Sequence, residues 1–184
     1  MKTETYKNII QKGSISDELE LEKALIIERK LRLLSASNPE FKEVRTQLRQ
    51  IIKDYEKKNW SSESEISDEK IKESDNAEYL AEQERKFLLK RKEIIKEKLS
   101  SFGLNQQDLG SILGHTKTYM SELMNGINPF TLKDLIIIHR LFKIKLEYLI
   151  PTTIPQKERG RIRLSIQKMN KPKLKLDKRD IEFA

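Results

Sequence analysis

The stretch LNQQDLGSILGHTKTYMSELMNG, residues 104–126, decides the fold. Two short amphipathic segments make up most of it, and Gly114 stands between them, where a tight turn needs a left-handed backbone. Asn105 and Thr116 precede the two segments and are residue types that cap helix N-termini. Gly110 is small at the place where the second helix must cross the first closely. The stretch therefore predicts two short helices joined by a tight turn.

The second predicted helix has an inner and an outer face. Met120 and Leu123 fall on the inner face, where they would pack on the apolar side of the first helix, Leu109 and Leu113. The residues predicted to face outward are Lys117, Thr118, Ser121 and Glu122. We therefore expect a buried apolar seam between the two helices and a polar surface opposite it.

These residues resemble the Xre and lambdoid-repressor type of helix-turn-helix. That type has leucine, a polar residue, glutamine, a two-residue gap, leucine, a small residue and then a leucine-glycine turn. Asn125-Gly126 and the predicted helices at 131–142 and 146–150 also match its five-helix domain. The resemblance implies an all-α domain at 78–150 that binds duplex operator DNA. Because one such domain covers only half an operator, a homodimer is expected.

The resemblance also implies a role for each polar residue of the motif. The second helix would enter the major groove, with Lys117, Thr118 and Glu122 at base-reading positions. Lysine can donate to guanine, glutamate can accept from the cytosine amino group, and threonine offers a hydroxyl and a methyl for thymine. The residues near the phosphate backbone would be Gln106, Tyr119, Asn125 and Ser121. A solvated charge is the alternative for Lys117, and a surface ion pair is the alternative for Glu122.

Two amphipathic helices are predicted before residue 60. The first begins after a cap at Ser16 and repeats apolar residues at steps of three and four. A turn at 35–39 separates it from the second, for which Asn38 is the predicted N-cap. The two helices would form an αα-hairpin over residues 1–59. A hairpin of this size is marginal alone, so it should dimerise, lean on the C-terminal domain or be completed by another protein.

The order of a helical N-terminal unit, a linker and this helix-turn-helix resembles the HigA-type antitoxins of bacterial toxin–antitoxin modules. The residues that carry the match are Gln107-Asp108-Leu109, Ser121-Glu122-Leu123-Met124-Asn125-Gly126 and Thr131-Leu132. The resemblance implies an antitoxin that neutralises a RelE-like, mRNA-cleaving toxin and represses its own operon. The toxin-binding residues that it implies in the hairpin are Leu21, Leu25, Ile27, Leu31, Leu34, Phe41, Val44 and Leu48. The alternative is a stand-alone Xre-family repressor, in which these apolar stripes only pack on each other.

The segments around these units are polar. Residues 60–77 are rich in Ser, Asp and Glu and predict a flexible acidic linker. Residues 80–100 predict a basic helix at the start of the C-terminal domain, with Leu88, Ile95 and Leu99 facing inward. The basic tail at 151–184 fits a short helix or a hairpin, and a helix followed by an extended segment is favoured.

Composition restricts the function further. The formal net charge is +8, and residues 61–82 are acidic whereas 83–150 and 151–184 are both basic, so positive charge concentrates in the half that would bind DNA. With no cysteine and only two histidines, neither a metal site nor a cofactor is expected. The sequence holds no phosphate-cradling glycine loop, nucleophile elbow or paired-carboxylate pattern, which argues against an enzyme. No apolar run reaches the length of a signal or membrane segment, so a cytoplasmic protein is expected.

Overall fold

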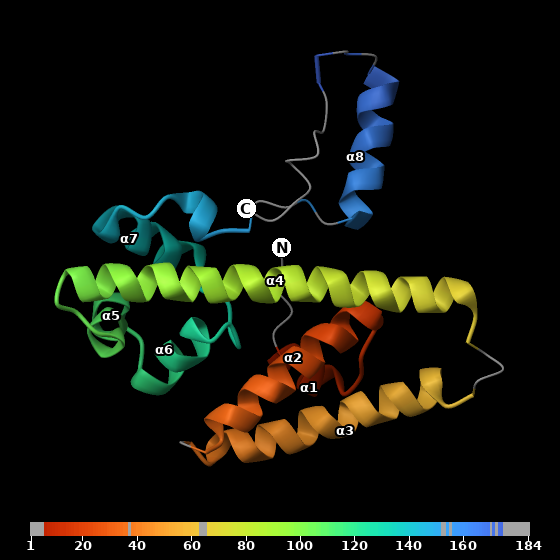
Figure 1. Cartoon of the computed structure of the whole chain (residues 1–184), viewed down its shortest axis with the longest axis horizontal. Helices are drawn as coiled ribbons and strands as arrows, with labels where there is room; N and C mark the ends of the chain where they lie inside the picture. The colour runs from red at the N-terminus through yellow and green to blue at the C-terminus, as the bar shows by residue number, and fades with distance from the viewer. Residues whose placement is uncertain are drawn as a thin grey trace.

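The computed structural model describes residues 6–36, 38–62, 66–151, 154, 156–169, 171 and 173–174. All regular elements within these residues are helices, which confirms the all-α prediction for the described chain (Figure 1). In chain order the elements are α1 (Tyr6–Lys12), α2 (Glu18–Leu34), α3 (Glu40–Trp60), α4 (Asp68–Ser101), α5 (Gln106–Leu113), α6 (Lys117–Met124), α7 (Leu132–Phe142), the 3-10 helix η2 (Leu146–Tyr148) and α8 (Gln156–Met169).

Helix α4 joins two groups of helices. It has 34 residues, which corresponds to a length of about 50 Å at 1.5 Å per residue. In Figure 1, α2 and α3 lie beneath one half of α4, α5 and α6 lie beneath the other half, and α7 lies above that second half. An ion pair of 2.8 Å between Lys23 and Glu84 links α2 directly to α4. The N-terminal helices therefore lean on the helix that begins the C-terminal group.

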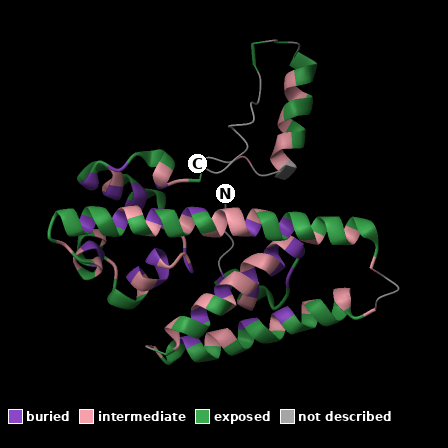
Figure 2. Ribbon diagram, in the orientation of Figure 1, coloured by how far each residue is buried: buried purple, intermediate pink, exposed green. Residues whose placement is uncertain are grey.

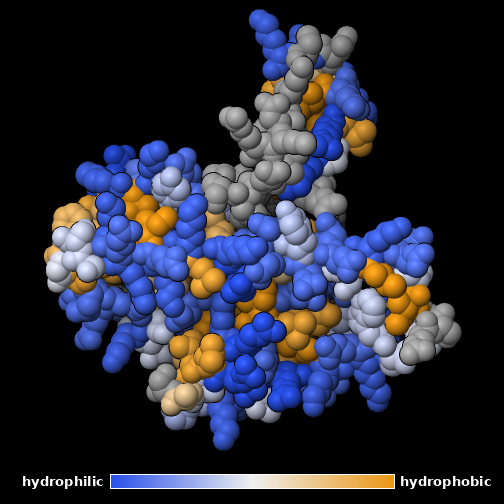
Figure 3. Space-filling model, in the orientation of Figure 1, coloured by the Kyte–Doolittle hydropathy of each residue, from blue (hydrophilic) through white to orange (hydrophobic). Residues whose placement is uncertain are grey.

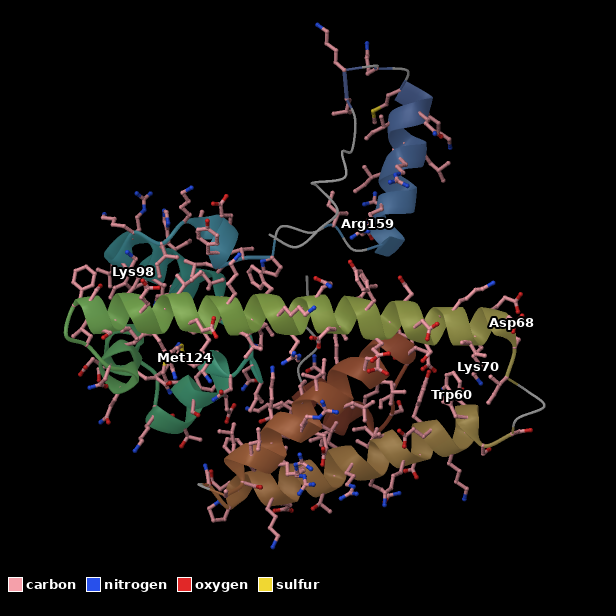
Figure 4. All side chains as sticks on the ribbon, viewed as in Figure 1. Trp60, Asp68, Lys70, Lys98, Met124 and Arg159 are labelled. Carbon is pink, nitrogen blue, oxygen red and sulfur yellow. The ribbon has the colours of Figure 1, made fainter. Side chains whose placement is uncertain are left out.

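The prediction of a linker at 60–77 is wrong for its second part, because α4 begins at Asp68. Ser67 caps the helix by accepting a hydrogen bond of 3.3 Å from the Lys70 amide. The acidic first turn matches the positive end of the helix dipole. The Lys70 ammonium also lies 5.0 Å from the centre of the Trp60 ring, and Figure 4 shows these side chains at the end of α3 beside the start of α4. A composition typical of a linker thus forms the first turns of a helix.

The basic tail is helical where it is described. Helix α8 covers Gln156–Met169, in agreement with the favoured prediction of a helix. The extended segment predicted to follow falls mostly on residues 175–184, which lie outside the described residues. Residues 63–65 of the predicted linker lie outside them as well.

The N-terminal helices enclose a hydrophobic core of their own. Helices α2 and α3 lie along each other, and α1, which the sequence pattern did not predict, packs against α3. The core buries most residues predicted to bind a toxin, namely Leu21, Ile27, Leu31, Phe41 and Leu48. The others, half-buried and packed against it, are Leu25, Leu34 and Val44. Helices α1, α2 and α3 therefore bury these apolar stripes against one another, which is the packing that the alternative interpretation expects, while toxin binding stays a prediction.

A second core holds α5, α6, α7 and η2 against the C-terminal half of α4. Leu109, Met120 and Leu123 are completely buried in it, as the inner-face pattern predicts. In Figure 2 buried positions gather beneath each half of α4. Ile127, which follows α6, packs into the N-terminal core and so connects the two. The position of α6 thus depends on contacts with both groups of helices.

Candidate nucleic-acid interface

The unit formed by α5 and α6 begins and turns as its sequence predicts. The Asn105 side-chain oxygen caps α5 by accepting hydrogen bonds of 2.7 and 3.2 Å from two first-turn amides. Asp108 in return accepts a bond of 2.7 Å from the Asn105 amide. Gly114 ends α5 with a left-handed backbone, φ 76°, and Thr116 caps α6 through a bond of 3.3 Å from the Tyr119 amide. Local residue chemistry therefore sets the start of both helices and the turn between them.

Helix α6 crosses α5 closely at Gly110. A side-chain carbon added at Gly110 would lie 3.2 Å from the His115 carbonyl oxygen and 3.5 Å from Met120 Cβ. The first of these distances is tighter than most Cβ contacts, so a side chain at Gly110 would require the His115 carbonyl of the turn to shift by a few tenths of an ångström. Because Met120 and Leu123 fill the seam, the crossing and the turn together fix α6 relative to α5.

Alanine at Gly114 is expected to lower the free energy of unfolding by about 1–2 kcal/mol, because a left-handed backbone penalises a Cβ. The space around Gly114 is open, so backbone strain is the whole effect. Alanine at Gly126 should cost slightly more, since φ is +64° there and the Leu88 side chain must also move its Cδ1, which would lie 2.8 Å from the new Cβ. Urea denaturation of both variants checks this order. A Gly126 variant as stable as the Gly114 variant would contradict it.

The residues predicted to contact DNA differ in their accessibility. Lys117 and Thr118 are exposed at the start of α6. Gln106, the first residue of α5, and Ser121, on α6, are partly exposed. Tyr119 and Asn125 are partly exposed as well, so Lys117 and Thr118 are the two fully exposed residues of the predicted site.

Glu122 is buried, so the prediction that it faces outward is wrong. Only 7% of its surface is exposed, and its carboxylate accepts a hydrogen bond from the side-chain amide of Asn128. Helix α1 supplies two titratable groups near it. Burial and the charge of Glu122 raise the pKa of Tyr6 to about 12, and the Lys7 ammonium acts on Glu122 itself. A carboxylate held inside the protein in this way does not present its oxygens to a base edge.

Glutamine at Glu122 should change stability in a way that depends on pH. Burial raises the pKa of Glu122, against the opposing effects of Lys7 and the Asn128 hydrogen bond. A carboxyl with a raised pKa holds its proton more tightly in the folded chain, so its ionisation costs stability as pH rises above the ordinary carboxyl range. The neutral glutamine avoids this cost. Urea denaturation from about pH 4 to pH 7 should show the variant gaining on the wild type; a constant or falling difference would contradict the burial of the charge.

Asn125 is held by hydrogen bonds within the protein. Its Nδ2 donates to the Ser121 carbonyl oxygen at 2.8 Å, and its Oδ1 accepts from Lys92 Nζ at 2.6 Å. Lys92 lies on α4, and sequence reasoning missed it because the contact spans 33 positions of the chain. The residue predicted to hold a phosphate thus has a cation directly beside it.

Tyr119 lies partly buried beside the turn. Its ring packs edge-on against that of His115, with ring centroids 5.0 Å apart. The His115 Nε2 in turn lies 3.1 Å from a carboxylate oxygen of Asp134 at the start of α7. Tyr119 therefore packs against the C-terminal core and supports the turn, while its contact with a phosphate stays a prediction.

The described residues offer neither a metal cluster nor a membrane-spanning helix. No three of their His, Asp or Glu side chains lie close enough together to hold a metal ion. None of the described helices combines the length and the hydrophobicity that a membrane span needs. The feature that the described residues do present is a polar surface on α5 and α6 with Lys92 and Asn125 at its edge.

A scan against protein-family models, a search of curated proteins and a search of solved structures each found no match.

Proposed function

We propose that the chain binds duplex DNA through α5 and α6 and acts as a sequence-specific transcriptional repressor. The observation that carries the proposal is the geometry of α6. It is a short capped helix, fixed by the turn at Gly114 and the crossing at Gly110. Its first residues, Lys117 and Thr118, are exposed. An α-helix has a diameter of about 10–12 Å and fits the major groove, which is about 12 Å wide. Helix α6 would lie in that groove.

Each accessible side chain has a contact suited to its chemistry. Lys117 would donate to the acceptors of guanine, and Thr118 would place its hydroxyl and methyl near a base edge. Gln106 and Ser121 would donate to phosphate oxygens, and the Lys92–Asn125 pair would bring a positive charge to the backbone. Specific sites are usually read by two copies about one helical turn of DNA apart, so the operator would bind a homodimer.

Selection from a pool of randomised duplexes tests this proposal. The full chain should enrich a defined sequence, and it should bind the enriched duplex at least about a thousandfold more tightly than a random one at physiological salt. Fluorescence anisotropy measures both affinities. A pool that shows no enriched sequence after repeated rounds, or equal affinity for both duplexes, would contradict sequence-specific binding.

A second candidate function is that of an antitoxin whose N-terminal helices bind a toxin. The specific observation in its favour is the separate core of α1, α2 and α3, which forms a helical unit beside the DNA-binding unit. The apolar stripe lies inside that unit, so a toxin would have to meet its exposed side chains. The test is expression of the reading frame adjacent to the chain's own gene. Growth arrest that the full chain relieves, with co-purification of the two proteins, is expected; an adjacent product that is harmless or does not co-purify would refute this candidate.

A further inference from the structure

A groove lies between α2, α4 and the end of α6. Its volume is about 290 Å³, and its apolar wall includes Leu33, Leu89 and Met124. The charged residues that line it are Arg29 and Lys30 from α2 and Arg85 and Lys92 from α4. None of the described side chains that line it is acidic. In Figure 3 the surface beneath the middle of α4 shows hydrophobic side chains beside strongly hydrophilic ones, and Figure 4 labels Met124 where α6 approaches α4.

Lys30 carries a positive charge that no described side chain pairs directly. Burial lowers the pKa of Lys30 to about 8; the Glu84 carboxylate opposes this shift, and the charges of Arg85, Lys92 and Arg91 add to it. Within the described part of the chain its ammonium makes no hydrogen bond and no ion pair. A half-buried cation among other cations is costly unless an anion approaches it.

Arg29 also lines a neighbouring hollow together with Glu22, Glu28, Glu78 and Glu82. Two acidic side chains beside the groove are already paired. The Glu84 carboxylate binds Lys23 on α2 at 2.8 Å. The Glu82 carboxylate binds Arg85 through two bonds, of 2.6 and 2.8 Å. Of the four cations that line the groove, Arg85 is thus paired, Lys92 bonds to the neutral Asn125, and the two from α2 form no ion pair with any described residue. An anion from outside the chain would complete the cluster.

The groove reaches the residue that the sequence predicts to hold a phosphate. Asn125 both ends α6 and lines the groove, and its Oδ1 accepts a hydrogen bond of 2.6 Å from Lys92. If α6 enters the major groove, the sugar-phosphate strand beside Asn125 continues past Lys92 towards α2. Phosphates are the anions that this position would meet, and the apolar wall would face the deoxyribose rings.

We infer that the groove extends the DNA interface, and that Arg29 and Lys30 of α2, together with Lys92 of α4, contact the phosphate backbone of the duplex that α6 reads. The inference rests on the proposed function and gives the N-terminal helices a part in DNA binding. An acidic segment of a protein is the other occupant that the charges would suit. It is less favoured because the groove runs directly into the end of α6.

The test compares two double variants that remove the same charge. R29Q/K30Q removes the two α2 cations of the groove, and K57Q/K58Q removes two exposed lysines in the last turn of α3. Trp60, just beyond that pair, lies far along α4 from Met124 in Figure 4, so the second variant is a matched control. Each variant is titrated against the duplex selected from the randomised pool, by anisotropy at several salt concentrations.

R29Q/K30Q should reduce the slope of log Kd against log salt concentration by about 1.8, because each phosphate that is no longer neutralised removes about 0.9. The same variant should weaken binding about tenfold at 0.1 M salt. K57Q/K58Q should leave the slope within about 0.3 of the wild-type value. Equal slopes for the two variants would overturn the inference while leaving DNA binding intact. Failure of the wild type to select any duplex would overturn the proposed function, and the inference with it. R29Q alone changes an exposed side chain and should still remove about 0.9 of slope, so the test does not depend on the fold tolerating the change at Lys30.

Discussion

Replacing Leu123 with alanine is expected to lower the free energy of unfolding by about 3–4 kcal/mol, within the range of fully buried leucines. Leu123 is completely buried in the seam of α5 and α6, where the shorter side chain leaves a cavity that the capped helices cannot collapse to fill. Urea denaturation followed by circular dichroism measures the change. DNA affinity should fall as well, because the same residue pins α6.

Leu33 provides the matched control for this substitution. It has the same side chain but is 70% exposed on α2, so alanine there should change the free energy of unfolding by less than about 0.5 kcal/mol. A decrease at Leu123 no larger than the decrease at Leu33 would mean that the seam between α5 and α6 does not form as described.

Alanine at Lys117 is expected to weaken binding to the selected duplex by about 1–3 kcal/mol, a factor of roughly 5 to 150, because the variant cannot donate a hydrogen bond to a base edge. The preference for the base at one operator position should disappear with it. Affinity for a random duplex should change little by comparison, since phosphate contacts dominate nonspecific binding. Anisotropy with the selected duplex and its single-base variants measures all three effects.

Lys98 is the control for this charge. It is exposed in the last turn of α4, and Figure 4 shows it above α4, on the side away from α6. Alanine at Lys98 should reduce the affinities for the selected and the random duplex by similar, small factors. If Lys117 and Lys98 behaved alike, Lys117 would be a solvated charge, the alternative that its sequence position leaves open.

The parts of the fold that could be predicted from the sequence depend on neighbouring residues. Asn105, Thr116 and Gly114 specify two helix starts and a turn through bonds and backbone angles within four residues, so the observed α5 and α6 match their expected positions. The inner face of α6 follows from a spacing of three between Met120 and Leu123. These local signals needed no knowledge of the rest of the chain.

The parts that could not be predicted depend on contacts between distant segments. Glu122 is buried with its carboxylate bonded to Asn128 and near the charge of Lys7 on α1, and nothing in the residues around it signals this environment. The apolar residues of α2 and α3 suit a partner surface and an internal core equally well by their spacing alone. Their burial follows from the way in which α1, α2 and α3 pack against one another, and α2 in turn packs on α4.

The early start of α4 has a similar cause. Residues 68–77 have the composition of a linker, but their acidic side chains favour a helix N-terminus, and Ala77 and Ala81 are buried on the half of α4 beside α2. The N-terminal helices are therefore part of the support of the unit formed by α5 and α6. Removing residues 1–60 would uncover Ile127, which packs into their core, so surface substitutions are the sharper tests.

Titration of the ¹⁵N-labelled chain with the selected duplex, followed by amide chemical shifts, tests the central claim most directly. The rival binding site is the basic tail, which could attract DNA without reading its sequence. If α6 enters the major groove, the largest changes in chemical shift will fall on Lys117, Thr118 and Gln106. The Lys92–Asn125 pair should shift strongly as well. A random duplex should produce much smaller changes at all these residues. Changes confined to α8 and the tail, and equal for both duplexes, would contradict the claim that α5 and α6 read DNA.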